Sequence, residues 1–251
     1  MDILIFALVL GRENMGPLNA RLEGLKGPAE TGLNTLCFRE IAAVVGEIPK
    51  SGLNTDRDSA IAYAAVIETL VQQFTLLPMR YGSAMESEEA VLGMIGRNYN
   101  EILDNLKKVE DKFEFGLKVF CDSVKLRTEM KEKTEAGALL RPPVIPAVSA
   151  SVFREYVNKK LMEHRLEEMM VNYVDSIIAE IKVCLSLMNA VTKFRKALSE
   201  AILIDAVFLV QRQRKSELLD AIRLLQEKYP GLNLMFTGPW PPYSFVDVTI
   251  K

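Results

Sequence analysis

Helical periodicity between residues 162 and 181 constrains the fold of this chain more than any other feature. Apolar residues recur there at intervals of three and four, the spacing that places side chains on one stripe of an α-helix. The stripe consists of Met162, Leu166, Met169, Met170, Tyr173, Val174, Ile177, Ile178 and Ile181. The sequence therefore predicts a long α-helix, which the second half of the chain has to accommodate.

The segments around this helix predict three strands. Residues 116–121 precede it, and the apolar runs 181–188 and 202–210 follow it. Residues 190–201, between the last two runs, have the composition of a helix. We expect the two later runs to pair with each other.

A second helix and a fourth strand complete this half. The helix carries Leu218, Leu219, Ile222, Leu225 and Gln226. It stops at Pro230-Gly231, and alternating apolar residues over 232–236 then predict a strand. The resulting order, strand, helix, strand, strand, helix, strand, is the βαββαβ order of a ferredoxin-like sandwich.

The first half of the chain also mixes strands and helices. Residues 3–10 are apolar, but Asp2 and the lack of a basic start or a cleavage site argue against a signal peptide. The run is also too short to cross a bilayer, so it predicts a buried first strand. A long loop is expected over 11–32, and 33–38 with 41–47 predict a hairpin or a bent strand pair.

Two capped helices follow in this half. Thr55 or Asp56 can cap the first, and Ser87, with acidic residues after it, begins the second. Residues 75–84 lie between them and predict a strand. Pro78 confines that strand to a sheet edge or a bulge, because proline has no N–H to donate.

Two α+β domains are the simplest interpretation of this order. Residues 1–112 are expected to form a small mixed α/β domain, and 113–251 a ferredoxin-like domain. The second domain contains a proline-rich insertion at 137–150, which is expected to be semi-rigid and extended. It also contains the tail GPWPPYSFV at 238–246.

The sequence shows no recognisable catalytic, cofactor-binding or metal-binding set. His164 is the single histidine, and its charged neighbours predict a solvated helix surface. Cys37, Cys121 and Cys184 are scattered and are expected to be small buried side chains. Phosphate-binding loops, GxGxxG and GxSxG are absent. We therefore expect no enzyme, no cofactor and no metal.

Charge and one arginine give two further expectations. The formal net charge of −2 lacks the basic excess of a nucleic-acid binder, so no nucleic-acid partner is expected. Arg80 falls inside the apolar predicted strand 75–84, where an unpaired guanidinium would be costly. Its expected partner is an acidic side chain of the same chain, and the alternative is a ligand.

The tail GPWPPYSFV combines rigidity with aromatic surface. Pro239, Pro241 and Pro242 fix φ and lack N–H donors, so the segment is predicted to be extended and stiff, outside any sheet ladder before Ser244. Its aromatic residues are Trp240, Tyr243 and Phe245. Two roles stay open: a clasp that holds the tail on the second domain's sheet, or a preformed aromatic surface for a partner.

Three segments together resemble the gas vesicle protein L/F family. They are TGPWPPYSFV at 237–246, LPMRYGSAMESEEAV at 77–91 and KKVEDKFEFGLKVF at 107–120. AVFLV at 206–210 is similar to the family's strand before its last helix. Tyr81 stands where phenylalanine is more usual, and 122–148 has no clearly alignable counterpart, so the role of this region is left open.

The resemblance implies a protein of gas vesicle formation, a minor structural or assembly component without enzymatic activity or cofactor. Its implied partners are the small hydrophobic major shell protein and other gas vesicle proteins, with no lipid membrane involved. Its implied location is the gas vesicle shell in the cytoplasm. The candidate partner-contact residues are Arg80, Gly238, Pro239, Trp240, Pro241, Pro242, Tyr243 and Phe245.

Two other classes of function compete with this interpretation. A small-molecule-binding or regulatory ferredoxin-like module would need a pocket with convergent polar groups, for example around Arg80. A hydrolase with an unfamiliar site would need a nucleophile and a base that the sequence does not reveal.

Overall fold

The computed structural model describes residues 1–11, 15–50, 56–120, 122–136, 151–186, 190–196 and 202–246. The chain forms two compact units, and each of them is assembled from separate stretches of sequence. Unit 1 consists of Met1–Phe115, Phe208–Lys215 and Thr237–Lys251. Unit 2 consists of Gly116–Val207 and Ser216–Phe236. The predicted insertion at 137–150 lies outside the described residues.

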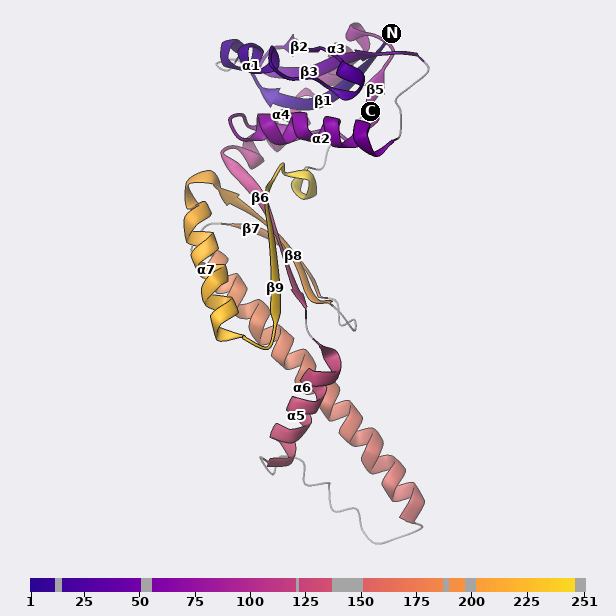
Figure 1. Cartoon of the computed structure of the whole chain (residues 1–251), viewed down its shortest axis with the longest axis vertical. Coiled ribbons are helices and arrows are strands. Elements are labelled where there is room, and N and C mark those ends of the chain that lie inside the picture. Colours follow the sequence, from indigo (N-terminus) through magenta and orange to yellow (C-terminus); the bar gives the residue numbers. More distant parts are fainter. Residues whose placement is uncertain are drawn as a thin grey trace. The chain divides into compact units, whose positions relative to one another are not determined.

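Unit 1 contains an antiparallel sheet with the N-terminal strand at its centre (Figure 1). Its strands are β1 (Asp2–Leu10), β2 (Leu33–Phe38), β3 (Ile41–Ile48), β4 (Leu76–Pro78) and β5 (Ala84–Met85). The order is β2-β3-β1-β4, and β5 also pairs with β1. The predicted first strand and the predicted hairpin are therefore confirmed.

The described residues of unit 1 include four α-helices. They are α1 (Met15–Leu22), α2 (Arg57–Val71), α3 (Glu88–Arg97) and α4 (Tyr99–Val109). Asp56 caps α2 by accepting the Ser59 N–H at 2.8 Å, and Ser87 caps α3 through the Ala90 N–H. These caps confirm the predicted helix starts. The loop expected over 11–32 is wrong in part, because α1 and a 3₁₀ turn at Pro28–Glu30 lie within it.

The strand predicted over 75–84 is divided in two. Strand β4 ends at Pro78, the chain turns at Gly82 with φ of +92°, and pairing resumes in β5. Because Pro78 cannot donate a ladder bond, β4 lies at the end of the strand order, as predicted from that residue. The segment in between, Met79–Ser83, carries Arg80 out of the sheet.

The second sheet has the order β7-β8-β6-β9. Its strands are β6 (Lys112–Phe120), β7 (Val191–Lys196), β8 (Ile202–Gln211) and β9 (Asn233–Trp240). The residues of β6, β8 and β9 are divided between the two units. The helices that accompany this sheet in the sequence are α5 (Ser123–Ala136), α6 (Ser151–Ser186) and α7 (Lys215–Lys228).

Helix α6 confirms the long predicted helix but extends further than expected. The strand predicted at 181–188 is wrong, because Ile181 and Leu185 continue the apolar stripe at intervals of four and are both buried. The strand before β8 is Val191–Lys196, inside the segment with helix-like composition. Helix α7 confirms the helical spacing predicted for this segment: it buries Leu218, Ile222 and Leu225 and leaves Leu219 exposed.

Strand β9 also corrects an expectation. Thr237–Trp240, including Pro239, belongs to this strand, although the prolines were predicted to keep the segment out of a ladder until Ser244. The physical reason is that β9 is last in the strand order, where hydrogen bonds are needed on one side only.

A glutamine side chain forms hydrogen bonds with backbone groups at the start of β9. The Gln226 side-chain amide donates to the Leu232 carbonyl at 2.8 Å, and its oxygen accepts the Leu234 N–H at 3.0 Å. A neighbouring strand would use the same kind of backbone groups, so the amide closes this part of the sheet edge.

Candidate functional site

The signature segment, defined as residues 237–246, ends β9 and then turns. After Trp240 the chain passes through two prolines into a 3₁₀ turn at Tyr243–Phe245. At Gly238 φ is +116°, and an added Cβ would lie 2.8 Å from Phe115 Cδ1 and 2.9 Å from the Glu114 carbonyl oxygen. Only glycine fits this backbone conformation and this close approach.

A buried carboxylate holds the second half of the signature segment. Glu114, on β6, is 6% exposed, and it accepts the Ser244 N–H at 2.8 Å and the Ser244 hydroxyl at 2.6 Å. Lys108 donates to the Phe245 carbonyl at 3.2 Å, and the Phe245 side chain is fully buried. Residues 107–115 of the mid-chain segment and the signature segment are therefore held together within unit 1.

The aromatic residues of the signature segment have different roles. Phe245 is the buried anchor, whereas Trp240 is 42% exposed and Tyr243 46% exposed. Burial, and then the negative charge of Glu68, raise the pKa of Tyr243 to about 12. Phe245 provides the anchoring expected of a clasp, and Trp240 and Tyr243 provide exposed aromatic surface.

Tyr63 of α2 organises the second family-like segment, LPMRYG at 77–82. Its hydroxyl lies 2.9 Å from the Ile5 carbonyl oxygen and 3.0 Å from that of Met79. Its ring stacks on Phe6 at 4.8 Å and meets Tyr81 edge-on at 5.0 Å. Burial, with smaller contributions from Tyr243 and Tyr81, raises the pKa of Tyr63, so its phenol stays a hydrogen-bond donor.

Arg80 is not the buried, paired arginine that was expected. Its backbone carbonyl accepts the Ser83 N–H at 3.0 Å, but its side chain is exposed and forms no ion pair with any residue that the structure describes. The cause is the turn after Pro78, which takes Arg80 out of the apolar strand. Its proposed role in partner contact stays a prediction.

Arg212 is a partly buried residue that the sequence did not single out. Its Nη1 and Nη2 donate to the carbonyls of Gln72 at 2.8 Å and Phe74 at 2.9 Å, just past the C-terminus of α2. The guanidinium lies 4.5 Å from the Phe113 ring centroid. Burial lowers the pKa of Arg212, partly opposed by the Asp111 carboxylate.

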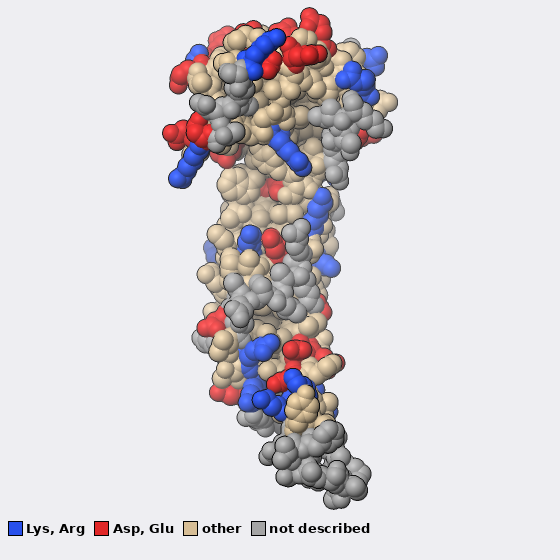
Figure 2. Space-filling model, turned by 90° about the vertical axis from the view of Figure 1, so that its right-hand side faces the viewer, with Lys and Arg blue, Asp and Glu red and all other residues tan. Residues whose placement is uncertain are grey.

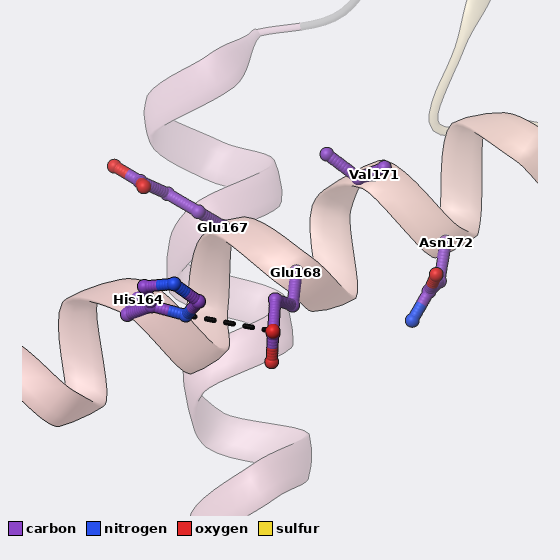
Figure 3. A pocket seen from close by; sticks show the side chains of 5 residues that line it. All are labelled: His164, Glu167, Glu168, Val171 and Asn172. Atoms are coloured by element: carbon purple, nitrogen blue, oxygen red, sulfur yellow. Dashed lines mark ion pairs between the residues drawn. The ribbon is translucent and has the colours of Figure 1, made fainter.

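The environment of His164 offers little for catalysis. Figure 3 shows the pocket beside it, and the five labelled side chains all come from α6. His164 Nδ1 lies 3.6 Å from Glu168 Oε1, and both side chains are largely exposed. This agrees with the predicted solvated helix surface. Within the described ranges, no three His, Cys, Asp or Glu side chains gather in a way that could hold a metal ion.

Cys37 is exposed, with its Sγ 3.5 Å from Met15 Sδ, because β2 lies at a sheet edge. The expectation that Cys37 is buried is therefore wrong.

On the face seen in Figure 2, acidic and basic side chains are interspersed and do not form one basic stripe. In the part of the chain that the structure describes, no helix is both long and apolar enough to span a membrane.

Comparison with known proteins identifies the class. Residues 4–247 match the family described as gas vesicle synthesis protein GvpL/GvpF. Gas vesicle protein F of a Streptomyces species is 26% identical over 240 residues, covering 95% of this chain and 97% of that protein. Gas vesicle protein L of the same organism is 23% identical over 247 residues, covering 90% and 87%.

A solved structure shows the same fold. The crystal structure of the gas vesicle protein GvpF from an Anabaena species superposes with a TM-score of 0.79, at 16% identity, over 99% of both chains. The family match and this fold thus define a mixed α/β gas vesicle protein with two antiparallel sheets. The chain belongs to the GvpL/GvpF family of gas vesicle synthesis proteins, as its resemblance to that family implied. Its role is therefore in gas vesicle formation, in association with other gas vesicle proteins.

Proposed function

We propose that this chain is a non-enzymatic minor component of gas vesicle assembly that binds the hydrophobic major shell protein, at the vesicle shell in the cytoplasm. The observation that carries the proposal is the exposure of Trp240 and Tyr243 on a segment anchored by Glu114 and Phe245. Exposed aromatic side chains on a rigid backbone are typical of the residues that dominate protein–protein binding.

The physical need for such a partner follows from the shell subunit itself. Before assembly, a very apolar subunit exposes surface and strand edges that favour aggregation. An accessory protein that covers part of that surface keeps the subunit available for ordered addition. We propose that Trp240 and Tyr243 make this contact, with Arg80 as a polar contributor.

The other candidate contact residues act by shaping the segment. Pro241 and Pro242 are buried with Phe245, and they fix the path between the two exposed aromatic residues. Gly238 and Pro239 set the backbone path of β9 just before Trp240. Their substitution is expected to weaken binding indirectly, through the position of the aromatic side chains.

The proposed domain arrangement has support from topology. We propose that residues 113–251 form a ferredoxin-like domain, as predicted from the βαββαβ order. The described elements run β6, α6, β7, β8, α7, β9, with α5 before α6, and their sheet has the order β7-β8-β6-β9. This is an antiparallel arrangement in which the first and third strands lie at the centre, as in a split βαβ unit.

The test uses the full chain and purified major shell protein. In the double variant Trp240→Ala with Tyr243→Ala, each truncation is expected to cost about 2 kcal/mol, or roughly thirty-fold in Kd per residue. The matched control is Ile61→Ala, which truncates another exposed apolar side chain of unit 1, 54% exposed on α2. Undiminished binding by the double variant, or equal losses in variant and control, would contradict the proposed contact.

A cellular experiment tests the assembly role separately. Cells that lack the gene are expected to lose buoyancy, and the wild-type chain is expected to restore it better than the double variant. Normal vesicles in the deletion strain would show that the protein is not needed for assembly.

A further inference from the structure

Glu114 is a buried acid in an otherwise apolar part of β6. It stands between Phe113 and Phe115, and all three residues are buried. Burying a carboxylate is costly unless hydrogen bonds replace its water. Ser244 supplies two donors, its N–H to Oε2 at 2.8 Å and its hydroxyl to Oε1 at 2.6 Å. Charge-assisted bonds of this length are among the stronger hydrogen bonds in proteins.

The position of Ser244 decides which parts of the signature segment are held. It lies in the 3₁₀ turn between Tyr243 and Phe245. Phe245 is fixed on one side by its buried ring and by the Lys108 bond to its carbonyl. On the other side, Tyr243 leaves the turn with its side chain 46% exposed. Fixing Ser244 therefore fixes the point from which Tyr243 projects.

The Glu114–Ser244 contact also limits the backbone freedom of Trp240. Only Pro241 and Pro242 separate it from Tyr243, and proline rings fix φ at both positions. On its other side, Trp240 is the last residue of β9. The indole is thus held between the strand and the Glu114–Ser244 contact, with little backbone freedom remaining.

We propose that Glu114 positions Trp240 and Tyr243 for binding the shell protein, without touching that protein itself. A buried carboxylate that orients an exposed pair of aromatic side chains reduces the entropy they lose on binding. The proposal rests on the proposed function for its partner, but the positioning itself can be measured on this chain alone.

The measurement uses Trp240, the single tryptophan of the chain, as the reporter. Acrylamide quenching and fluorescence anisotropy of Trp240 are compared in the full-length wild type, Glu114→Gln, Glu114→Ala and Ser244→Ala. The control is Glu110→Gln, which makes the same charge change at an exposed position four residues earlier. Binding to purified major shell protein is measured for each variant.

We expect the Glu114 variants to show stronger quenching and lower anisotropy than the wild type, and to bind about tenfold more weakly. Ser244→Ala keeps its N–H bond to Glu114, so its effect is expected to be smaller in both measurements. Glu110→Gln is expected to match the wild type.

Two results would overturn the proposal. Wild-type quenching in a folded Glu114→Ala variant shows that the carboxylate does not position the segment. Altered quenching with undiminished binding shows that the positioning has no bearing on the partner. If the wild type itself does not bind the shell protein, the proposed function fails, and quenching alone then decides the positioning. Should Glu114→Ala not fold, Ser244→Ala makes the same comparison with the buried acid retained.

Discussion

Replacing Arg212 by methionine measures what one cation contributes to the stability of unit 1. Methionine keeps an apolar side chain against Phe113 and removes both hydrogen bonds to the carbonyls of Gln72 and Phe74. Those carbonyls follow the C-terminus of α2, where a helix leaves unsatisfied acceptors and where positive charge is favourable.

The size of the effect follows from the contacts of the guanidinium. A hydrogen bond from a charged group contributes about 1.5–3 kcal/mol net, so the two bonds set an upper range of about 3–6 kcal/mol. Against this, the buried Arg212 Nε has no hydrogen-bond partner among the described residues, which costs about 1–3 kcal/mol in the wild type. We expect Arg212→Met to destabilise unit 1 by about 2–3 kcal/mol.

Urea unfolding followed by Trp240 fluorescence is the appropriate assay, because Trp240 belongs to unit 1. The midpoint is expected to fall with an unchanged slope, which indicates a stability change without altered compactness. Arg80→Met is the control, since it removes an exposed guanidinium from the same unit. A loss below about 0.5 kcal/mol, the usual limit for surface substitutions, would refute the assigned role of Arg212.

Three further substitutions or titrations test other features. Gly238→Ala is expected to destabilise unit 1 by about 1–3 kcal/mol, because φ at Gly238 is +116° and an added Cβ would lie only 2.9 Å from the Glu114 carbonyl oxygen; an unchanged urea midpoint would argue against this. Gln226→Ala is expected to speed hydrogen exchange of the Leu234 amide and to promote concentration-dependent self-association, measured by light scattering; a strictly monomeric variant with wild-type exchange would show that the amide does not protect the edge. The pKa of Tyr243 is raised from 10.0 to about 12 in the folded state. Between these two pH values the folded state therefore keeps the phenol proton that the unfolded state loses. The contribution of Tyr243 to stability is therefore complete below about pH 10 and lost as pH rises towards 12, and Tyr243→Phe should reduce this alkaline loss in pH-dependent unfolding.

Short-range sequence patterns correctly predicted those elements that are determined by neighbouring residues. The apolar run of β1, the caps at Asp56 and Ser87 and the long stripe of α6 each depend on residues within a few positions. The edge position of β4 followed from Pro78 alone. Strand β7 was missed because its lysines and arginine have good helix propensity, and pairing with β8 overrides that weak preference.

The contacts of the candidate site depend on residues far apart in the sequence. Glu114 and Ser244 are separated by 130 positions, and no spacing rule connects them. The acid between two phenylalanines in β6 was nevertheless a signal, because a carboxylate in a buried strand needs a donor. Arg212 gave no such signal, since its neighbours are polar and its acceptors lie just past the end of α2, about 140 positions earlier.

Building unit 1 from three stretches of sequence sets the timing of its folding during translation. Residues up to Phe115 leave the ribosome well before Thr237, a delay on the order of ten seconds at usual elongation rates. Throughout that interval Glu114 lacks its Ser244 donors, and the site that Phe245 fills is open to solvent. The nascent N-terminal part therefore completes its packing only when the last stretch has been synthesised, so the signature segment is added as the closing piece of the unit.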